Sequence, residues 1–339
     1  MNTYNPFNAL LIFLGICLLG YLFFRPKHGW FWLIKNNSTT TQKVVAEDIL
    51  KRLYHNENAS NYLNINDVVR ILKQDEKMVV ESIDKMVTLG WVKMEGDIVR
   101  LTKSGSDYAL RIIRAHRLWE RYLADKTGFN KSEWHQRAER KEHELTIDDT
   151  DLLAKTLGNP QFDPHGDPIP TISGKMAKLK GVPVSELNTR TIGRIIHIKD
   201  KPDIIYKQIM AENIHIGSII RIVEKSPERI VFHSEGEAFK LAPIVAGNIT
   251  VSVLEKDVSY EEDILRLNSL KKDEIGKIIG ISKEIRGESR RRLLDLGFVK
   301  GADVSIDLLN PLGEPKAYLI KGTSIALRNN QASKILIKK

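Results

Sequence analysis

Cysteine is almost absent from this chain of 339 residues, in which Cys17 is the only one. A single thiol excludes a disulfide within the chain, cysteine-rich zinc sites and iron–sulfur clusters, because each needs two or more thiols. Any bound metal must therefore be held by histidine and carboxylate side chains. The sequence also lacks a nucleophile elbow, a phosphate-binding loop and an HExxH motif. We therefore predict that the protein is not an enzyme.

Charge and apolar content are those of globular domains. Charged residues make up 28% and hydrophobic residues 42% of the chain. The net charge of +9 permits contact with nucleic acid or with an anionic membrane surface but requires neither. The length predicts two or more domains.

One long apolar run lies near the N-terminus. Residues 7–24, FNALLIFLGICLLGYLFF, carry no charge and are near the lower limit for a membrane span, which needs about 17–25 residues. No Lys or Arg precedes the run, whereas basic and aromatic residues alternate over 25–35, a pattern typical of the cytoplasmic interface. A signal peptide and a buried soluble helix are the alternatives. We predict that 1–36 forms a single-pass anchor in the cytoplasmic (inner) membrane, with the bulk of the chain in the cytoplasm.

The segment 37–104 has the pattern of a small DNA-binding domain. Apolar residues at helical spacing predict helices over 42–55, 65–72 and 75–89. Alternation around Gly96 and Asp97 then predicts a hairpin over 91–102. Three helices followed by a hairpin are typical of a winged helix-turn-helix, although an unrelated small α+β domain has the same pattern.

The segment 105–180 is predicted to be mostly helical and rich in metal-binding residue types. Its histidines and glutamates recur at helical spacing: His116, Glu120, His135, Glu139, Glu142 and His143. Because residues four, seven and eight apart share a helix face, two neighbouring helices could direct these groups to common points. Such donors suit Mn(II), Fe(II), Co(II) or Zn(II), and a solvated charged helix is the alternative. We interpret His165, in the Pro/Gly-rich turn over 158–171, as a loop residue rather than a ligand.

The C-terminal half contains an internal repeat. IGRIIHI at 192 matches IGKIIGI at 275, IHIGSIIRI at 214 matches FVKGADVSI at 298, and LAPIVAGNITV at 241 matches LRNNQASKILI at 327. The offset of 83 to 86 residues indicates two copies of one unit. Short β-rich runs separated by turns predict a small β-barrel in each copy, over 186–256 and 266–339.

Several blocks in order carry a family resemblance. The helix-turn-helix and wing, AHRLWERYL, WHQRAERKEHEL and DPHGDPIP resemble the diphtheria-toxin-repressor and manganese-repressor family of metal-dependent transcription regulators, over 42–254. In the second copy, ESRRRLLDLGFVKGADVSI and NPLGEP resemble a FeoA-type SH3-like domain. The resulting expectation is an α+β multidomain protein. It would comprise a transmembrane helix, a winged helix-turn-helix, a helical metal-binding and dimerisation domain, and two small SH3-like β-barrels.

The resemblance also implies two metal sites. The principal site would use Asp48, Glu139, Glu142 and His143. The ancillary site would use His116, Glu120 and His135, with Asp200 or Asp203 from the first barrel. Carboxylates at Asp48 and Glu139, where iron-type relatives have Met and Cys, favour Mn(II) or Fe(II), with other divalent transition metals possible. Lys51 stands where manganese-type relatives have a glutamate, which argues against a two-metal cluster of that kind.

The implied activity is metal-dependent binding of a homodimer to a double-stranded DNA operator. The candidate DNA-contacting residues are Lys73, Lys77, Glu81, Lys85, Lys93 and Arg100. The segment 42–103 has ten basic and ten acidic residues, so its electrostatic attraction for DNA phosphate is weak. The residues after the apolar run resemble the end of metal-transporter permeases. The alternative is therefore a metal-sensing regulator that contacts transporter subunits instead of DNA.

Overall fold

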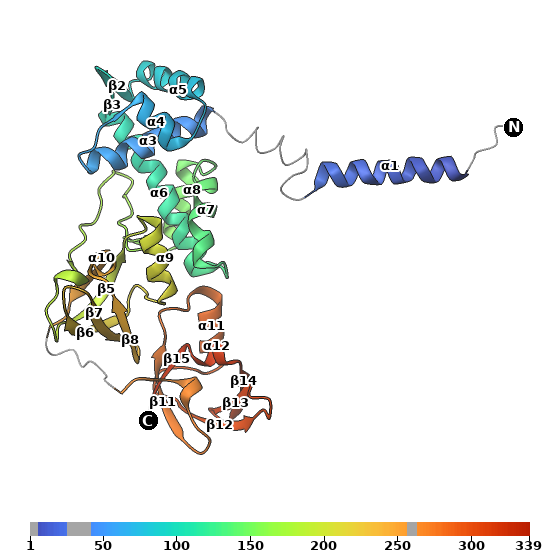
Figure 1. Ribbon diagram of the computed structural model, residues 1–339, viewed down its shortest axis with the longest axis vertical. Helices are drawn as coiled ribbons and strands as arrows, with labels where there is room; N and C mark the ends of the chain where they lie inside the picture. Colours follow the sequence, from blue (N-terminus) through green and yellow to red (C-terminus); the bar gives the residue numbers. More distant parts are fainter. Residues whose placement is uncertain (1–5, 26–41, 256–262) are drawn as a thin grey trace. The chain divides into compact units, whose positions relative to one another are not determined.

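The protein consists of two compact units, Met1–Ile112 and Ile113–Lys339 (Figure 1). The computed structural model describes residues 6–25, 42–255 and 263–339. Within those ranges the fold is α+β, with mainly helices and one small sheet before residue 160, and two six-stranded sheets with short helices after residue 180. The division into five domains stays a prediction.

The apolar run forms helix α1, Pro6–Phe24, but the predicted transmembrane element is wrong. Among the described residues, no helix is both long and apolar enough to cross a membrane. The 19 residues of α1 rise by about 28 Å, which is slightly less than the hydrocarbon core of about 30 Å. The fold class is therefore corrected, and the predicted location as a single-pass inner-membrane protein is wrong with it. The basic and aromatic residues at 26–35 lie outside the described residues.

Three helices and a small sheet follow α1 in the first unit. They are α3 Gln42–Asn58, β1 Leu63–Asn64, α4 Ile65–Leu72, α5 Glu76–Thr88, β2 Val92–Glu95 and β3 Ile98–Leu101. The sheet is antiparallel, in the order β1-β3-β2. A capping box between Asn64 and Asp67 starts α4, and the Asp75 side chain caps α5. One face of each helix is apolar, so Val45, Ile49, Val68 and Ile83 share one buried core.

Helix α6, Lys103–Lys126, begins in the first unit and ends in the second. At its start, a Cβ on Gly105 would lie 1.9 Å from the Trp91 carbonyl oxygen, so only glycine permits this close approach to the hairpin. Helices α7, Lys131–Lys141, and α8, Ile147–Thr156, follow it. Trp134 of α7 packs against Leu123 and Ala124 of α6, which holds the two helices together.

Two six-stranded sheets with the same strand order make up the rest of the second unit. The first has the order β4-β9-β5-β6-β7-β8 and the second β10-β15-β11-β12-β13-β14. The first comprises β4 Val182–Pro183, β5 Ile192–Ile198, β6 Ile219–Lys225, β7 Ile230–Ser234, β8 Glu237–Leu241 and β9 Ile249–Val253, with helices α9 Asp203–Ala211 and α10 Pro243–Ala246. The second comprises β10 Leu265–Arg266, β11 Ile275–Ile281, β12 Asp303–Leu309, β13 Lys316–Ile320, β14 Thr323–Leu327 and β15 Ile335–Lys338, with helices α11 Gly287–Asp295 and α12 Asn329–Ala332.

The two sheets also share their irregularities. The pairing shifts between Ile195 and His197 in β5 and between Ile278 and Gly280 in β11, which are corresponding positions. Each sheet encloses its own apolar core, with Phe232 in the first and Tyr318 in the second fully buried. The internal repeat is therefore visible in the backbone. Its description as SH3-like stays a prediction.

Candidate metal centre

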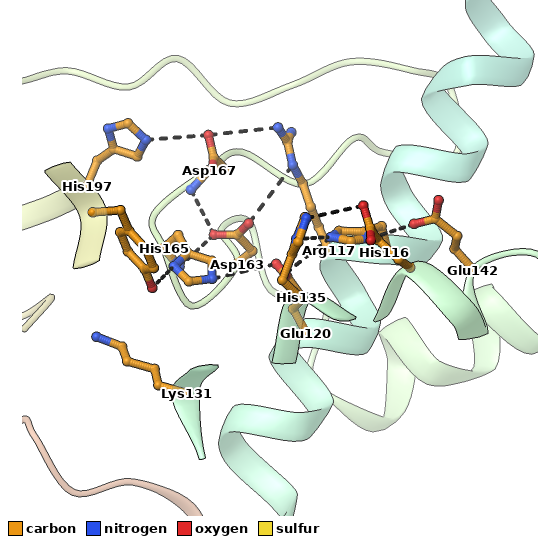
Figure 2. Close-up of polar contacts among 12 residues, drawn as sticks. His116, Arg117, Glu120, Lys131, His135, Glu142, Asp163, His165, Asp167 and His197 are labelled. Carbon is orange, nitrogen blue, oxygen red and sulfur yellow. Dashed lines mark hydrogen bonds and ion pairs between the residues drawn. The ribbon is translucent and has the colours of Figure 1, made fainter. Parts of the chain in front are cut away.

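Helices α6 and α7 bring His116, Glu120 and His135 together in the second unit (Figure 2). The His116 Nε2 atom lies 3.2 Å from Glu120 Oε1 and 3.2 Å from His135 Nδ1. The His135 Nδ1 atom lies 3.1 Å from Glu120 Oε1. His116 and Glu120 are buried, whereas His135 is exposed at the edge of the group. The three donors predicted for the ancillary site therefore converge from two helices.

The chemistry of this donor set fits a divalent metal ion. One potential ligand atom of each residue lies within 4.8 Å of the others. At metal–ligand distances of about 2.0–2.2 Å, neighbouring ligands of one ion lie about 3 Å apart, which is the spacing found here. Two imidazole nitrogens and a carboxylate oxygen facing one another cannot all be satisfied by a single shared proton. A metal ion would satisfy all three lone pairs.

A buried carboxylate orients His116. The Glu142 carboxylate accepts a hydrogen bond from His116 Nδ1, and Glu142 is only 3% exposed. This contact holds the other ring nitrogen, Nε2, toward Glu120 and His135. Carboxylates in this position fix the tautomer of metal-binding histidines and increase their basicity. On the opposite side, Glu139 Oε1 lies 3.3 Å from His135 Nε2 and orients that ring in the same way.

The pKa shifts of Glu120 and His135 indicate that the centre favours positive charge, which protons supply when no metal ion is bound. Burial alone would raise the pKa of Glu120, but hydrogen bonds from His116 and His135 hold it well below its usual range. The carboxylates of Glu120 and Glu139 raise the pKa of His135 to about 10 against the opposing effect of burial. Such a site attracts positive charge, and a metal ion that binds must displace the proton.

The residues predicted for the principal site are distributed over both units. Asp48 lies on α3 in the first unit, whereas Glu139, Glu142 and His143 lie in the second. Helix α7 ends at Lys141, and Glu142 is its C-cap. His143, which was expected on this helix, lies beyond its end. His143 Nε2 is 3.7 Å from Glu142 Oε1. A metal shared by these four residues stays a prediction.

The sequence did not predict that the loop 163–167 lies beside the metal donors. His165 is 7% exposed, its Nδ1 is 3.1 Å from the Tyr206 hydroxyl, and its Nε2 is 3.9 Å from Glu120 Oε2. A Cβ on Gly166 would lie 2.1 Å from the Ile196 carbonyl oxygen, so glycine allows the loop to lie against β5. His165 is a loop residue as interpreted, but it is buried next to the metal centre. The clustering of polar residues with Pro and Gly in DPHGDPIP was the available signal.

Two aspartates, the buried Asp163 and the half-buried Asp167, anchor this loop. Asp163 accepts hydrogen bonds from the backbone amides of His165 and Asp167, at 2.8 and 2.9 Å. Arg117 of α6 lies 4.0 Å from Asp163 and 3.8 Å from Asp167, and His197 of β5 lies 3.4 Å from Asp167. Burial, then the nearby carboxylates of Asp167 and Glu120, raises the pKa of Asp163 well above its usual range. The loop therefore links the metal helices to the first sheet.

The two aspartates predicted as ligands from the first barrel do not join the donor group. Asp203 is exposed, and its carboxylate lies 2.6 Å from Lys207 Nζ on the same helix. Asp200 lines a hollow that also borders His135 and His165. Neither belongs to the group of donors that lie within 4.8 Å of one another.

The predicted DNA-contacting residues lie at the C-cap of α4, on α5 and on the hairpin of the first unit. Lys73, Lys77, Glu81 and Lys85 are all exposed. On the hairpin, Lys93 lies 2.6 Å and Arg100 3.5 Å from the Glu95 carboxylate, and Arg100 stacks 4.0 Å from the centre of the Tyr62 ring. Because both hairpin cations share one carboxylate, their attraction for phosphate is reduced. Their role in DNA contact stays a prediction.

Two regions match models of known protein families. Residues 102–171 match the iron dependent repressor, metal binding and dimerisation domain. Residues 265–339 match the FeoA domain. The converging donors at 116, 120 and 135 all fall inside the first of these regions.

Similar proteins include both repressors and a membrane protein. A solved structure titled a manganese-dependent transcriptional repressor complex with manganese has a TM-score of 0.52 and 27% identity, and covers 62% of this chain and 100% of that chain. The "Iron-dependent repressor IdeR" of Mycobacterium tuberculosis is 37% identical over 100 residues, 29% of this chain and 44% of that protein. A "Probable metal transport system membrane protein" of Chlamydia pneumoniae is 34% identical over 162 residues, 46% of this chain.

The match to the Chlamydia pneumoniae protein spans only 35% of that protein's length. None of these relatives bears the name of an enzyme, in agreement with the prediction from the sequence. The matched regions include the helices that carry the metal donors and the whole second sheet. The chain therefore contains a metal-binding and dimerisation domain of the iron-dependent repressor type and a FeoA domain.

Proposed function

We propose that this protein is a metal-dependent transcription regulator that binds Mn(II) or Fe(II) and, as a homodimer, binds double-stranded DNA. The observation that carries the proposal is the convergence of His116 Nε2, Glu120 Oε1 and His135 Nδ1 within 3.1–3.2 Å of one another. Relatives named as iron-dependent and manganese-dependent repressors support this choice of metals. The matched dimerisation domain supports the homodimer.

The chain's own residues have separate tasks in this proposal. His116, Glu120 and His135 hold the ion, while Glu142 and Glu139 orient the two imidazoles through their other ring nitrogens. When bound, the metal supplies a positive charge that replaces the shared proton. The principal site predicted on Asp48, Glu139, Glu142 and His143 takes donors from both units of the chain. Metal binding there would favour one arrangement of the DNA-binding unit, so metal and DNA affinities would be linked reciprocally.

Metal titration of variants tests the ancillary site. We expect His135→Ala to weaken Mn(II) binding by about tenfold to a hundredfold, as measured by isothermal titration calorimetry, because one of three converging donors is lost. His233→Ala is the matched control, since His233 is exposed on β7 and belongs to neither predicted metal site. Equal affinities of the two variants would contradict the assignment.

A selection experiment tests DNA binding without knowledge of the operator. Random-sequence duplexes would be selected with the full chain in the presence of Mn(II) and again with a chelator. We expect a sequence motif to be enriched only with metal, and we expect Glu142→Gln to abolish the metal dependence. Enrichment that is identical with and without metal would refute the coupling.

A second candidate function is regulation of a metal transporter by protein contact. The resemblance to a membrane protein of a metal transport system in Chlamydia pneumoniae favours it. The pairing of Lys93 and Arg100 with Glu95 also leaves the hairpin with little free positive charge for DNA. Co-purification of metal-transporter subunits with the full chain, together with failure to select any DNA motif, would favour this candidate over the first.

A further inference from the structure

The second unit contains a hollow of about 750 Å³ whose lining includes the candidate metal donor His135 and extends to residues outside the metal centre. It lies between the first turn of α7, helix α9 of the first sheet and the segment 284–289 of the second sheet. The residues of its lining that matter here are Lys131, Tyr206, Met210, His215 and Arg286. Its volume is within the range of small-molecule sites, roughly 300–1,000 Å³.

Two half-buried cations line this hollow without a carboxylate partner. The Lys131 ammonium lies 3.3 Å from Met210 Sδ and 3.4 Å from His215 Nδ1, both uncharged acceptors. The Arg286 guanidinium donates to the Ile216 carbonyl oxygen at 3.5 Å. Among the described residues, no carboxylate oxygen lies within 4.0 Å of either cation. In Figure 2, no dashed line joins Lys131 to the acidic residues drawn.

Most acidic groups near the hollow are neutralised by other residues. Asp203 pairs with Lys207 at 2.6 Å, and Glu284 pairs with Lys334. Asp200 is the remaining carboxylate of the lining and is followed by Lys201. Lys131 and Arg286 therefore leave the lining with an excess of positive charge. Such an excess is unfavourable, because half-buried cations need counter-ions.

Arg286 also lines a neighbouring hollow of about 460 Å³. The cationic residues of this second hollow add to the positive potential around Arg286. Its cationic residues are Arg121, Arg194, Lys283, Arg286, Arg290 and Arg291. Its one carboxylate, Asp125, lies 2.6 Å from Arg121 and is thereby neutralised. Negative charge is therefore scarce throughout this region of the described chain.

Two uncharged features complete an anion site. His215 is only 7% exposed, and its Nε2 atom is buried without a hydrogen-bond partner in the described chain. The α7 helix begins at the hollow, and its N-cap residue, Asn130, makes no side-chain capping hydrogen bond. The Glu133 amide donates to the Asn130 carbonyl oxygen, whereas the first amides of such a helix lack a partner within it and can donate to an anion at the positive end of the helix dipole.

We propose that this hollow binds a phosphorylated small molecule, with its phosphate group held between Lys131, Arg286 and the first turn of α7. Inorganic phosphate and phosphate esters share this chemistry, and the volume of the hollow favours an ester. The site joins the metal-binding helix α7, in which Lys131 lies one turn before His135, to the second sheet. It goes beyond the proposed regulator function and does not depend on metal or DNA binding.

Calorimetric titration of the full chain tests the site, with inorganic phosphate and glycerol 3-phosphate as probes. We expect saturable binding with Kd below roughly 1 mM. Lys131→Met should weaken it at least tenfold. Lys207→Met is the matched control, because Lys207 lines the same hollow but is paired with Asp203, and its binding should stay within twofold of the natural chain. Tighter binding of the ester than of phosphate would identify the ester as the natural class, and equal binding would identify phosphate itself.

The absence of binding by either probe, or equal affinity in the Lys131 and Lys207 variants, would overturn the proposal. Far-UV circular dichroism and the thermal midpoint of each variant establish that it is folded. Arg286→Met is a second variant and should also weaken binding at least tenfold. If Arg286→Met does not fold, the Lys131 comparison decides alone.

The pH dependence of anion binding separates a direct role of Lys131 from a structural one. Burial, then the nearby Arg286 charge, lowers the pKa of Lys131 to about 7, with Glu284 acting in the opposite direction. His215 and His165 also face this group, and burial lowers the pKa of each histidine. An anion needs the protonated lysine, so affinity should fall as the pH rises above 7.

Sulfate is the probe for this measurement because its charge is constant over the working range. We expect its Kd to rise by roughly tenfold per pH unit above 7 in the natural chain. In Lys131→Met the residual binding should not change with pH. A natural chain whose sulfate affinity is independent of pH would refute the contact with Lys131.

Discussion

The two six-stranded sheets of the second unit have one topology and different chemistry. Strand order and the position of the bulge in the third strand of the order agree between them. Even Gly217 and Gly301, which correspond in the repeat, share φ angles of +90° and +89°. Yet His197 and His215 of the first sheet stand where the second has Gly280 and Val299. The two copies of the repeat therefore share a backbone, while a few polar positions give the first sheet its contacts with the loop beside the candidate metal centre.

These polar positions determine which sheet contacts the loop beside the metal centre. His197 lies 3.4 Å from Asp167, and Tyr206 lies 3.1 Å from His165. The second sheet instead contributes Arg286 and basic residues of α11 to the neighbouring hollows. A backbone shared by the two sheets therefore contacts the loop beside the candidate metal centre in one copy and, in our proposal, contributes to an anion site in the other.

The largest effect is expected from a pair of glycines with nearly equal backbone angles. Gly166 and Gly301 have φ of +88° and +89°, but a Cβ would lie 2.1 Å from a carbonyl oxygen at Gly166 and meets nothing within 4 Å at Gly301. Gly301→Ala should cost about 1 kcal/mol from conformation alone, whereas Gly166→Ala should cost roughly 3 kcal/mol or more because the loop must move. Chemical denaturation measures both. Equal losses would show that crowding at β5 is unimportant.

Removal of a sheet-specific histidine should have the next largest effect. His197→Ala removes one of the two side-chain partners of the half-buried Asp167 carboxylate, the other being Arg117, and should lower the free energy of unfolding by about 1–3 kcal/mol. Gly280→Ala, at the corresponding position of the second sheet, is the control, because a Cβ there meets nothing within 4 Å. We expect the control to change stability by less than about 0.5 kcal/mol. A larger loss in the control would break the proposed contrast between the sheets.

A stabilising substitution is expected in the core of the second sheet. The Tyr318 hydroxyl is buried without a hydrogen-bond partner in the described chain, and burial raises the pKa of Tyr318 to about 12. Tyr318→Phe should therefore raise the free energy of unfolding by up to about 1 kcal/mol. Phe232 occupies the corresponding core of the first sheet, so Phe232→Tyr should have the opposite effect. Thermal or denaturant unfolding of both variants measures the signs.

Metal removal should affect one sheet more than the other. If the proposed centre binds Mn(II), a chelator should increase amide hydrogen exchange in the loop 163–167, where His165 approaches the donor Glu120, and in β5 and α9, which contact that loop. Strands β12 to β14 contact none of the donors in the described chain and should keep their protection. Mass spectrometry of exchange with and without Mn(II) tests this, and equal changes in both sheets would show that the loop does not transmit the effect.

Much of the local structure was predictable because its signals are periodic. The helices at 42–58, 65–72 and 76–88 and the hairpin at 92–101 agree with the apolar spacing, with capping by Asn64 and Asp75. The pairing of His116 with Glu120 follows from their separation by one helical turn. The convergence of His135 onto them was expected from the resemblance and the shared helix faces. The membrane span was predicted wrongly because the apolar run at 7–24 is only as long as the shortest membrane-spanning helices.

The rest could not be predicted because it depends on contacts between distant segments. The burial of His165 and the anchoring of Asp163 require the close approach of Gly166 to β5, which is set by the fold and not by local pattern. The pairing of Arg100 with Glu95 likewise arises from cross-strand geometry, whereas Lys93 reaches Glu95 along the same strand. The residue types of Lys93 and Arg100 do not indicate whether each cation is paired with a carboxylate or available to bind phosphate.

The helical spacing of the histidines and glutamates, the exclusion of thiolate sites and the two-copy β-rich half all follow from the order of residues, because periodicity and composition are properties of the chain itself. The packing of α6 against α7, which brings three donors within 3.2 Å of one another, is a property of the folded chain. The folded chain also determines that Lys131 and Arg286, 155 positions apart in the sequence, line one hollow without a counter-ion. The physical reason is that charge pairing and metal geometry depend on distances of a few ångströms in space, which the separation of residues along a chain does not specify.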